Sequence, residues 1–140
     1  MSFDPHWEHF DRGTDVGVRG FGLSQATAFE QAAHGLVAVL ADPSGVRVVQ
    51  WLDIRLTGDD PQLLLADWLN ALLTEMSAQR MLLCHFHVTL LGNQLSARVA
   101  GEPAALDRHR LRGDVRAASH AEALVTFDGE RWIAQAVLGF

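Results

Sequence analysis

Two segments of the chain carry apolar residues at every third or fourth position, the spacing of one buried helix face. The first helix is predicted to follow the N-cap residue Ser24 and to stop at 42–45, where the sequence is Asp-Pro-Ser-Gly. The second is predicted to start at Pro61, with Asp60 as its cap, and to run to about Ala78. The apolar positions are Phe29, Ala33, Leu36, Val37 and Leu40 in the first segment and Leu64, Leu65, Trp68, Leu69, Leu72 and Met76 in the second.

Shorter segments that are rich in β-branched residues or that alternate apolar with polar residues predict the strands. The first of them is interrupted by glycines, which permit bulges or turns. Two pairs of segments flank Gly92-Asn93 and Asp128-Gly129, residue pairs that favour tight hairpin turns. The expected strands are 7–22, 46–57, 85–91, 94–100, 118–127 and 131–138, and residues 101–113 are expected to be irregular.

The order of these elements, strand, helix, strand, helix and then further strands, predicts an α+β fold. We expect a sandwich of a mixed or antiparallel sheet with the two main helices on one face. A chain of 140 residues has the usual size of one domain, and no repeat or linker is visible. The sequence therefore predicts a single domain over residues 1–140.

The charged residues limit which partners the protein can bind and which enzyme classes it can belong to. The chain has 17 acidic and 11 basic residues, a formal net charge of −6. Proteins that wrap bare nucleic acid need a basic surface, so we expect no DNA binding and only an indirect role on tRNA or other RNA. Every basic residue is arginine, which excludes the enzyme classes that depend on a phosphate-binding or Schiff-base lysine.

The cysteine content and the hydropathy of the chain indicate the cellular compartment in which the protein is expected. Cys84 is the only cysteine, so no intramolecular disulfide and no multi-cysteine zinc site can form. A reducing compartment fits this composition, and we expect a cytoplasmic protein. No apolar run reaches the roughly 18 residues that span a bilayer, so no membrane association is expected.

Several polar residues are candidates for chemistry. Asp15 has two interpretations, a turn-capping carboxylate or a ligand for a hard cation such as Ca²⁺ or Mg²⁺. His85 and His87 are two residues apart on a predicted strand and so share a face, but no third metal ligand is fixed by the sequence, which favours a structural or solvent-facing role. A hydrolase built from these histidines, or from His120 with Glu122, is disfavoured because no set of nucleophile, base and orienting group is visible.

Two further groups of residues have alternative interpretations. The four tryptophans are expected to lie in the core rather than to form a base-stacking platform. One basic cluster is predicted either to dock a phosphate or an acidic partner or to be a solvated loop neutralised by Asp107 and Asp114. The cluster consists of Arg108, His109, Arg110, Arg112 and Arg116.

Four stretches of the sequence, in order along nearly the whole chain, resemble the archease family. The first is similar to the family's opening strand with its Ala-Asp-Val-Gly core, and the second to its first helix and the stop that follows. The stretches are Trp-Glu-His-Phe-Asp-Arg-Gly-Thr-Asp-Val-Gly-Val at 7–18, Ala-Phe-Glu-Gln-Ala-Ala at 28–33 with Ala-Asp-Pro at 41–43, Leu-Leu-Ala-Asp-Trp-Leu-Asn-Ala-Leu-Leu at 64–73, and Gly-Glu-Pro at 101–103.

The resemblance implies a specific function. Archeases are non-catalytic accessory proteins that activate the RtcB-type GTP-dependent RNA ligase of tRNA splicing and RNA repair, by promoting guanylylation of the ligase and its multiple turnover. The basic cluster around Arg110 would then be a docking surface for the ligase. The alternative is a chaperone-like protein-binding module with no ligase-specific activity.

The resemblance also implies a divalent cation, Ca²⁺, bound by the residue that matches Asp15 and by a C-terminal pair of Asp and an apolar residue. Here that pair is Gly139-Phe140, so the second carboxylate side chain is missing. The terminal carboxylate of Phe140 would complete the site together with Asp15 and water. Two more departures are Arg12, where the family commonly has His, and Arg-Ala-Ala-Ser-His-Ala at 116–121, where it commonly has Lys-Ala-x-Thr-Tyr-His.

Overall fold

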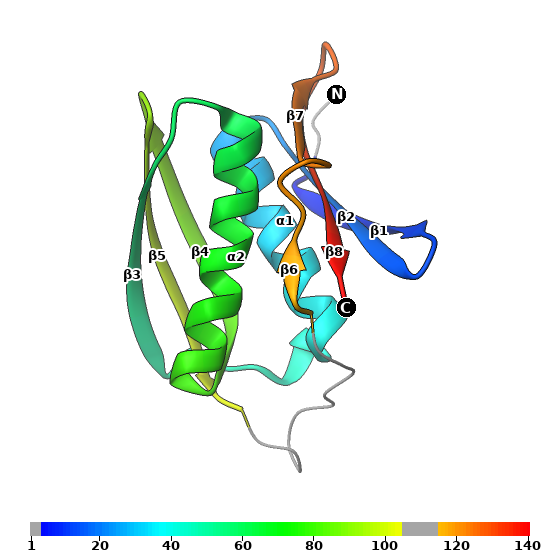
Figure 1. The fold of residues 1–140 in the computed structure, drawn as a ribbon. Helices are drawn as coiled ribbons and strands as arrows, with labels where there is room; N and C mark the ends of the chain where they lie inside the picture. The colour runs from blue at the N-terminus through cyan, green and yellow to red at the C-terminus, as the bar shows by residue number, and fades with distance from the viewer. Residues whose placement is uncertain (1–3, 105–114) are drawn as a thin grey trace.

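Two helices and two antiparallel sheets account for most of the residues that the computed structural model describes, which are 4–104 and 115–140. Figure 1 shows their arrangement. The elements are β1 (His6–Arg12), β2 (Asp15–Gly22), α1 (Gln25–Leu40), the short 3₁₀ helix η1 (Pro43–Gly45), β3 (Gln50–Thr57), α2 (Pro61–Gln79), β4 (Met81–Leu91), β5 (Gln94–Pro103), β6 (Ala117–Ala118), β7 (Leu124–Phe127) and β8 (Trp132–Gly139).

The helices lie between the two sheets. One sheet has the strand order β1-β2-β8-β6, with β7 also paired to β8, and the other has the order β3-β5-β4. Both helices contact strands of both sheets, and the buried core draws residues from all of them (Figure 1). The predicted α+β class is confirmed. The strands form two sheets rather than one because each sheet has a single apolar face to bury, and the helices cover both.

The helix boundaries agree closely with the prediction. Ser24 caps α1 by accepting a hydrogen bond on its Oγ from the Thr27 amide at 3.1 Å. Asp60 caps α2 in the same way from the Gln62 amide at 2.9 Å, with Pro61 in the first turn. Neither helix, among the residues described, is long and apolar enough to cross a membrane.

Two of the predicted strands differ from the strands of the structure. The predicted strand 7–22 is wrong: it is the hairpin β1–β2, which turns at Gly13 (φ +65°) and pairs Arg12 with Asp15. The predicted strand 118–127 is also wrong, since it divides into β6 and β7. The hairpin turns at Gly92 (φ +60°) and Gly129 (φ +98°) are confirmed, because both need the left-handed backbone that glycine adopts without strain.

Other strand ends moved by a few residues. β3 begins at Gln50 rather than at 46, and β4 begins four residues earlier than predicted, at Met81. β5 continues to Pro103 into the segment predicted to be irregular. Burial explains the last two differences, because Leu82, Leu83 and Glu102 are buried and their backbone groups must be paired.

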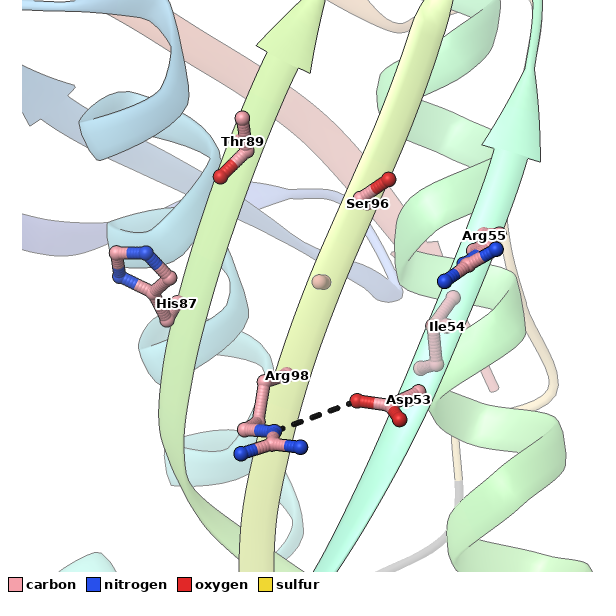
Figure 2. Close-up of a pocket in the computed structure, with 8 residues that line it drawn as sticks. Asp53, Ile54, Arg55, His87, Thr89, Ser96 and Arg98 are labelled. Carbon is pink, nitrogen blue, oxygen red and sulfur yellow. Dashed lines mark hydrogen bonds and ion pairs between the residues drawn. The ribbon is translucent and has the colours of Figure 1, made fainter.

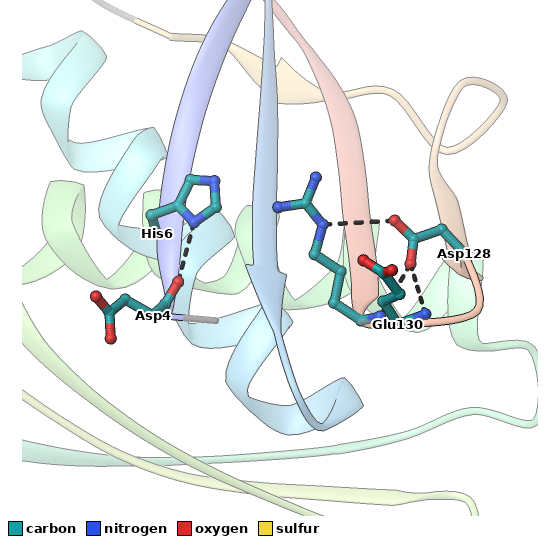
Figure 3. A network of polar contacts seen from close by, with 5 residues as sticks. Asp4, His6, Asp128 and Glu130 are labelled. Atoms are coloured by element: carbon teal, nitrogen blue, oxygen red, sulfur yellow. Dashed lines mark hydrogen bonds and ion pairs between the residues drawn. The ribbon is translucent and has the colours of Figure 1, made fainter. Parts of the chain in front are cut away.

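The turn between β7 and β8 is held by one carboxylate (Figure 3). Asp128 Oδ1 accepts hydrogen bonds from the backbone amides of Glu130 at 3.0 Å and Arg131 at 2.9 Å. These two bonds favour the charged carboxylate and lower the pKa of Asp128, with the Arg131 amide as the larger cause. The Arg131 guanidinium lies 4.1 Å from the ring centre of Phe21, which ties this turn to β2.

The tryptophans do not all lie in the core. Trp68 is fully buried on α2, and its indole N–H donates to the Phe29 carbonyl of α1 at 3.0 Å, as expected for a core tryptophan with a polar edge. Trp51 on β3 is 48% exposed. The prediction of a core position was therefore wrong for Trp51, because β3 presents alternate residues to opposite faces of its sheet and Trp51 is on the outer one.

β2 packs against α1 with backbone in contact with backbone. A Cβ atom on Gly20 would overlap the carbonyl oxygen of Ala28 and the amide nitrogen of Ala32. Gly17 serves the other face of β2, where the Phe10 ring of β1 occupies the space of a side chain. The registers of β2 with β1 and β8 are continuous through both positions. These glycines therefore permit close approach, not the bulges that the sequence suggested.

Gly20→Ala should lower the free energy of unfolding by about 3 kcal/mol or more, because the methyl group meets helix backbone that cannot move aside. Gly45→Ala is the matched control, since nothing lies within 4 Å of its Cβ position and its φ is not positive. Its unfolding free energy should stay within about 0.5 kcal/mol of wild type. Urea unfolding followed by circular dichroism measures both, and equal stability of the two variants would contradict this packing.

Candidate functional site at the end of β8

The last strand, β8, lies in the interior of its sheet with a partner on each side. Val16 of β2 and Ala118 of β6 both pair with Leu138. Both partners run antiparallel to β8, so the start of β2 and the residues before β6 converge on the end of β8. We call the place defined by Asp15, Arg116, Gly139 and Phe140 the Asp15 corner.

Asp15 and the chain's end meet at this corner. Asp15 precedes Val16 by one residue, and Gly139 follows Leu138 by one residue, so both extend beyond the same strand pair. Asp15 is half-buried, and Phe140 is 46% exposed. The register therefore brings Asp15 opposite the end of β8, next to Gly139 and one residue from Phe140, the other residue that was predicted to bind a metal.

The other side of the corner is fixed by α2. Asn70 donates its side-chain amide to the Ala118 carbonyl at 3.1 Å and accepts from the Ala118 amide at 2.8 Å. The Arg116 amide donates to the Gly139 carbonyl at 2.8 Å. Asn70 was missed as a functional candidate. Its signal in the sequence was a polar residue inside the apolar part of the second helix.

A cation and a carboxylate pair beside Asp15. Arg12, the strand partner of Asp15, donates from Nε and Nη2 to Glu122. The hydrogen bond to Glu122, followed by its charge, raises the pKa of Arg12 above the usual value for arginine. Both side chains are exposed, so the pair directs the guanidinium but contributes little to stability. The Arg12 charge is thus engaged by Glu122 rather than by Asp15.

The donor atoms at the corner are those of a hard-cation site. The carboxylate of Asp15 and the oxygens at the end of β8 are the ligand type that Ca²⁺ prefers, but a Ca²⁺ ion needs six to eight of them. Among residues 4–104 and 115–140, no group of three or more His, Cys, Asp or Glu side chains is placed to hold a metal ion. A cation here would depend on Asp15, main-chain oxygens at the end of β8 and water.

The remaining predicted site residues lie elsewhere. Arg108, His109, Arg110 and Arg112 of the basic cluster fall outside the described residues, while Arg116 is exposed at the Asp15 corner.

The three histidines that were considered for hydrolysis are not brought together. His85 and His87 share the outer face of the other sheet, as predicted for strand neighbours, and both are exposed. His120 contacts Asp67 at 2.7 Å, and Glu122 pairs with Arg12. No triad of nucleophile, base and orienting group joins these residues.

Comparison with known proteins shows the family of the chain. A model of the Archease protein family (MTH1598/TM1083) matches residues 7–139. The protein archease of Pyrococcus abyssi is 29% identical over 136 residues, which cover 94% of this chain and 96% of that protein. The archease-like protein of Drosophila melanogaster is 30% identical over 128 residues, covering 89% of this chain and 82% of its own length.

Solved structures share the fold. The solution structure of protein 1598 of Methanobacterium thermoautotrophicum superposes with a TM-score of 0.80 at 23% identity, over 96% of this chain and 98% of that one. The crystal structure of a Thermotoga maritima protein described as an archease and possible chaperone gives a TM-score of 0.57 at 15% identity, over 95% and 100%.

The fold and the corner define a small α+β protein in which two antiparallel sheets enclose two helices and the last strand ends beside an acidic residue. With a family model that covers nearly its whole length, the chain belongs to the archease family.

Asn70→Ala should lower the free energy of unfolding by about 1–3 kcal/mol, because it leaves the N–H and C=O groups of a buried residue, Ala118, without their partners. Hydrogen exchange at the Ala118 amide should accelerate as well. Asn93→Ala is the control, since Asn93 is exposed and its side-chain amide donates to the exposed Asp59, at 3.2 Å. If the Ala118 amide exchanged at the wild-type rate in Asn70→Ala, the clamp on β6 would be contradicted.

Proposed function

We propose that this protein activates an RtcB-type GTP-dependent RNA ligase in tRNA splicing or RNA repair. It promotes guanylylation of the ligase and repeated turnover, and it performs no chemistry of its own. The ligase is its direct partner, and it is through the ligase that the protein promotes the joining of RNA ends. The observation that carries the proposal is the Asp15 corner in a chain of the archease family, where the first β2 residue meets the end of β8.

The Asp15 corner has the properties of a surface that docks on a protein partner. Asp15 and Arg116 supply charges of both signs, and Phe140 supplies an exposed apolar ring. Pairs of this kind orient an encounter and fix its register more than they add affinity. β8, at the centre of the corner, is held from both sides by β2 and β6, and Asn70 ties β6 to α2, so the corner is ordered before it docks. From the sequence alone, we assign Arg108, His109, Arg110 and Arg112, which lie outside the described residues, to the same docking function as Arg116.

A chaperone-like role is the second candidate, because one structural relative is described as a possible chaperone. Such a protein would bind exposed apolar surface on many proteins, whereas an activator changes one step of one enzyme. The two roles are separated by adding the protein to its cognate ligase and, in parallel, to an unrelated aggregating protein.

With the cognate ligase, labelled GTP and cleaved RNA, the protein should increase the guanylylated ligase and raise ligation above one product per ligase. Asp15→Asn should reduce this stimulation at least severalfold, because it removes the charge at the corner. Asp4→Asn is the matched control, since Asp4 is exposed and its carboxylate points away from His6 (Figure 3). A ligase whose guanylylation and turnover do not respond to the wild-type protein would exclude the proposed function.

We also propose that the corner binds a divalent cation, Ca²⁺, through Asp15 and the Phe140 carboxylate, with water completing the site. When bound, the ion would add positive charge where the protein meets a nucleotide-loaded partner. The side chains of this protein supply few of the ligands, so binding should be weak and should depend strongly on each carboxylate.

Calorimetric titration with Ca²⁺ should show binding to the wild type that weakens by about tenfold or more in Asp15→Ala. Adding one glycine after Phe140 displaces the terminal carboxylate, and this variant should also bind Ca²⁺ more weakly than the wild type. Equal heats in the wild type and Asp15→Ala, or none in either, would refute the metal site and leave the ligase assay to stand on its own.

A further inference from the structure

The β3-β5-β4 sheet buries one face against the helices, and no other described element covers its second face (Figure 1). Ile54, Phe86 and Val99 are among the residues on its buried face, all less than a tenth exposed. The outer face is polar and charged rather than apolar. The residues that matter on it are Trp51, Asp53, Arg55, His85, His87 and Arg98, all of them exposed.

These side chains form rows across the three strands. In the first row, Ala100 of β5 pairs with Trp51 on one side and His85 on the other. The two rings lie 5.2 Å apart, centre to centre, at 71°, and Ala100 beneath them is fully buried. The Trp51 indole is nevertheless 48% exposed, so it remains available to a planar ligand.

The next row carries charge. Arg98 pairs with Asp53 and His87 on its two sides, and its Nε donates to Asp53 Oδ1 at 3.4 Å (Figure 2). The Arg98 guanidinium carbon is 5.8 Å from the centre of the Trp51 ring, within the range of a cation–π contact. Among the described residues, the terminal nitrogens of Arg98 have no other hydrogen-bond partner.

Arg55 follows in the third row, opposite Ser96. It forms no ion pair with any residue in the described parts of the chain. A shallow pocket lies between Asp53, Arg55, His87 and Arg98 (Figure 2). This face thus has two guanidinium groups, two imidazoles and one carboxylate, in a chain whose formal net charge is −6.

We infer that this face binds a short single strand of nucleic acid, with a base stacked on Trp51 and phosphates at Arg98 and Arg55. Stacking on exposed aromatic rings beside cationic side chains is how sheet surfaces hold single strands. Trp51 and Arg55 are four residues apart on β3, about 13 Å, so one strand would follow β3 across all three rows. An acidic peptide would satisfy the arginines but leave the indole without a partner.

This inference goes beyond the indirect role on RNA that the net charge predicted. The choice of RNA rather than DNA rests on the proposed function, since a ligase activator works beside RNA ends. Two phosphate contacts in an acidic protein give modest affinity, with a dissociation constant of roughly 10⁻⁴ to 10⁻⁶ M. For a single strand, log K should fall with log salt with a slope of about −1.4, or about −0.7 for each phosphate.

Fluorescence anisotropy with a fluorescein-labelled oligouridine of about ten nucleotides, at low salt and without the ligase, tests this. Trp51→Ala should weaken binding roughly 5- to 100-fold. Arg55→Gln and Arg98→Gln should each weaken it and reduce the salt slope by about 0.7. The controls are Phe127→Ala, an aromatic residue of 50% exposure, and Arg12→Gln, both on the other sheet. Both should bind like the wild type.

Absence of binding at low salt would overturn the inference, and so would unchanged affinity in Trp51→Ala. A polyglutamate peptide that displaced the RNA at equal concentration would also overturn it, in favour of an acidic protein partner. Because the ligase is absent from this assay, a negative result here leaves the guanylylation test untouched. All substituted residues are exposed, so unchanged thermal unfolding of each variant verifies that the fold is intact.

Discussion

The contact of β2 with α1 is the constraint on which the rest of the structure depends. At Gly20 the strand and the helix meet backbone to backbone, and no side chain separates them. This contact fixes how closely α1 approaches the sheet, and α1 in turn contacts α2, where the Trp68 indole donates to the Phe29 carbonyl. Both sheets pack on this pair of helices, so the separation of the sheets follows from how closely β2 and α1 approach.

The same strand determines where the end of β8 lies. Because β2 pairs with β8 in a continuous antiparallel register, the first residue of β2 and the last residues of β8 must lie together. β6 adds a second partner to β8, and Asn70 links β6 to α2. Terminal strands are usually among the more mobile parts of a protein, but here the end is held by neighbours on both sides. The Asp15 corner therefore needs little further ordering of its backbone when it docks on a partner.

Local signals in the sequence predicted the local structure. The caps at Ser24 and Asp60 and the turns at Gly92 and Gly129 were identified because each depends on a few adjacent residues. The hairpin at Gly13 was not, since Gly-Thr is not one of the residue pairs that mark a tight hairpin.

The division into two sheets, and with it the outward position of Trp51, depends on pairing between distant strands that no local pattern encodes. The candidate site, too, could be predicted only in part. Asp15 was a candidate from its residue type, and the resemblance to archeases pointed to the chain's end, but their proximity follows from pairing over more than a hundred residues. Asn70 was missed because its side chain binds the backbone of Ala118, a residue that is far away in the sequence.

The structure therefore presents two polar surfaces on different sheets, the Asp15 corner and the outer face of β3-β5-β4 (Figure 1). Of these two surfaces, we propose that the Asp15 corner is the one that meets the ligase. The most direct test is an NMR titration of the ¹⁵N-labelled protein with its cognate ligase. Line broadening or shifts should begin at the amides of Asp15, Arg116 and Gly139. Perturbation that spared these amides while affecting other surfaces would contradict the claim.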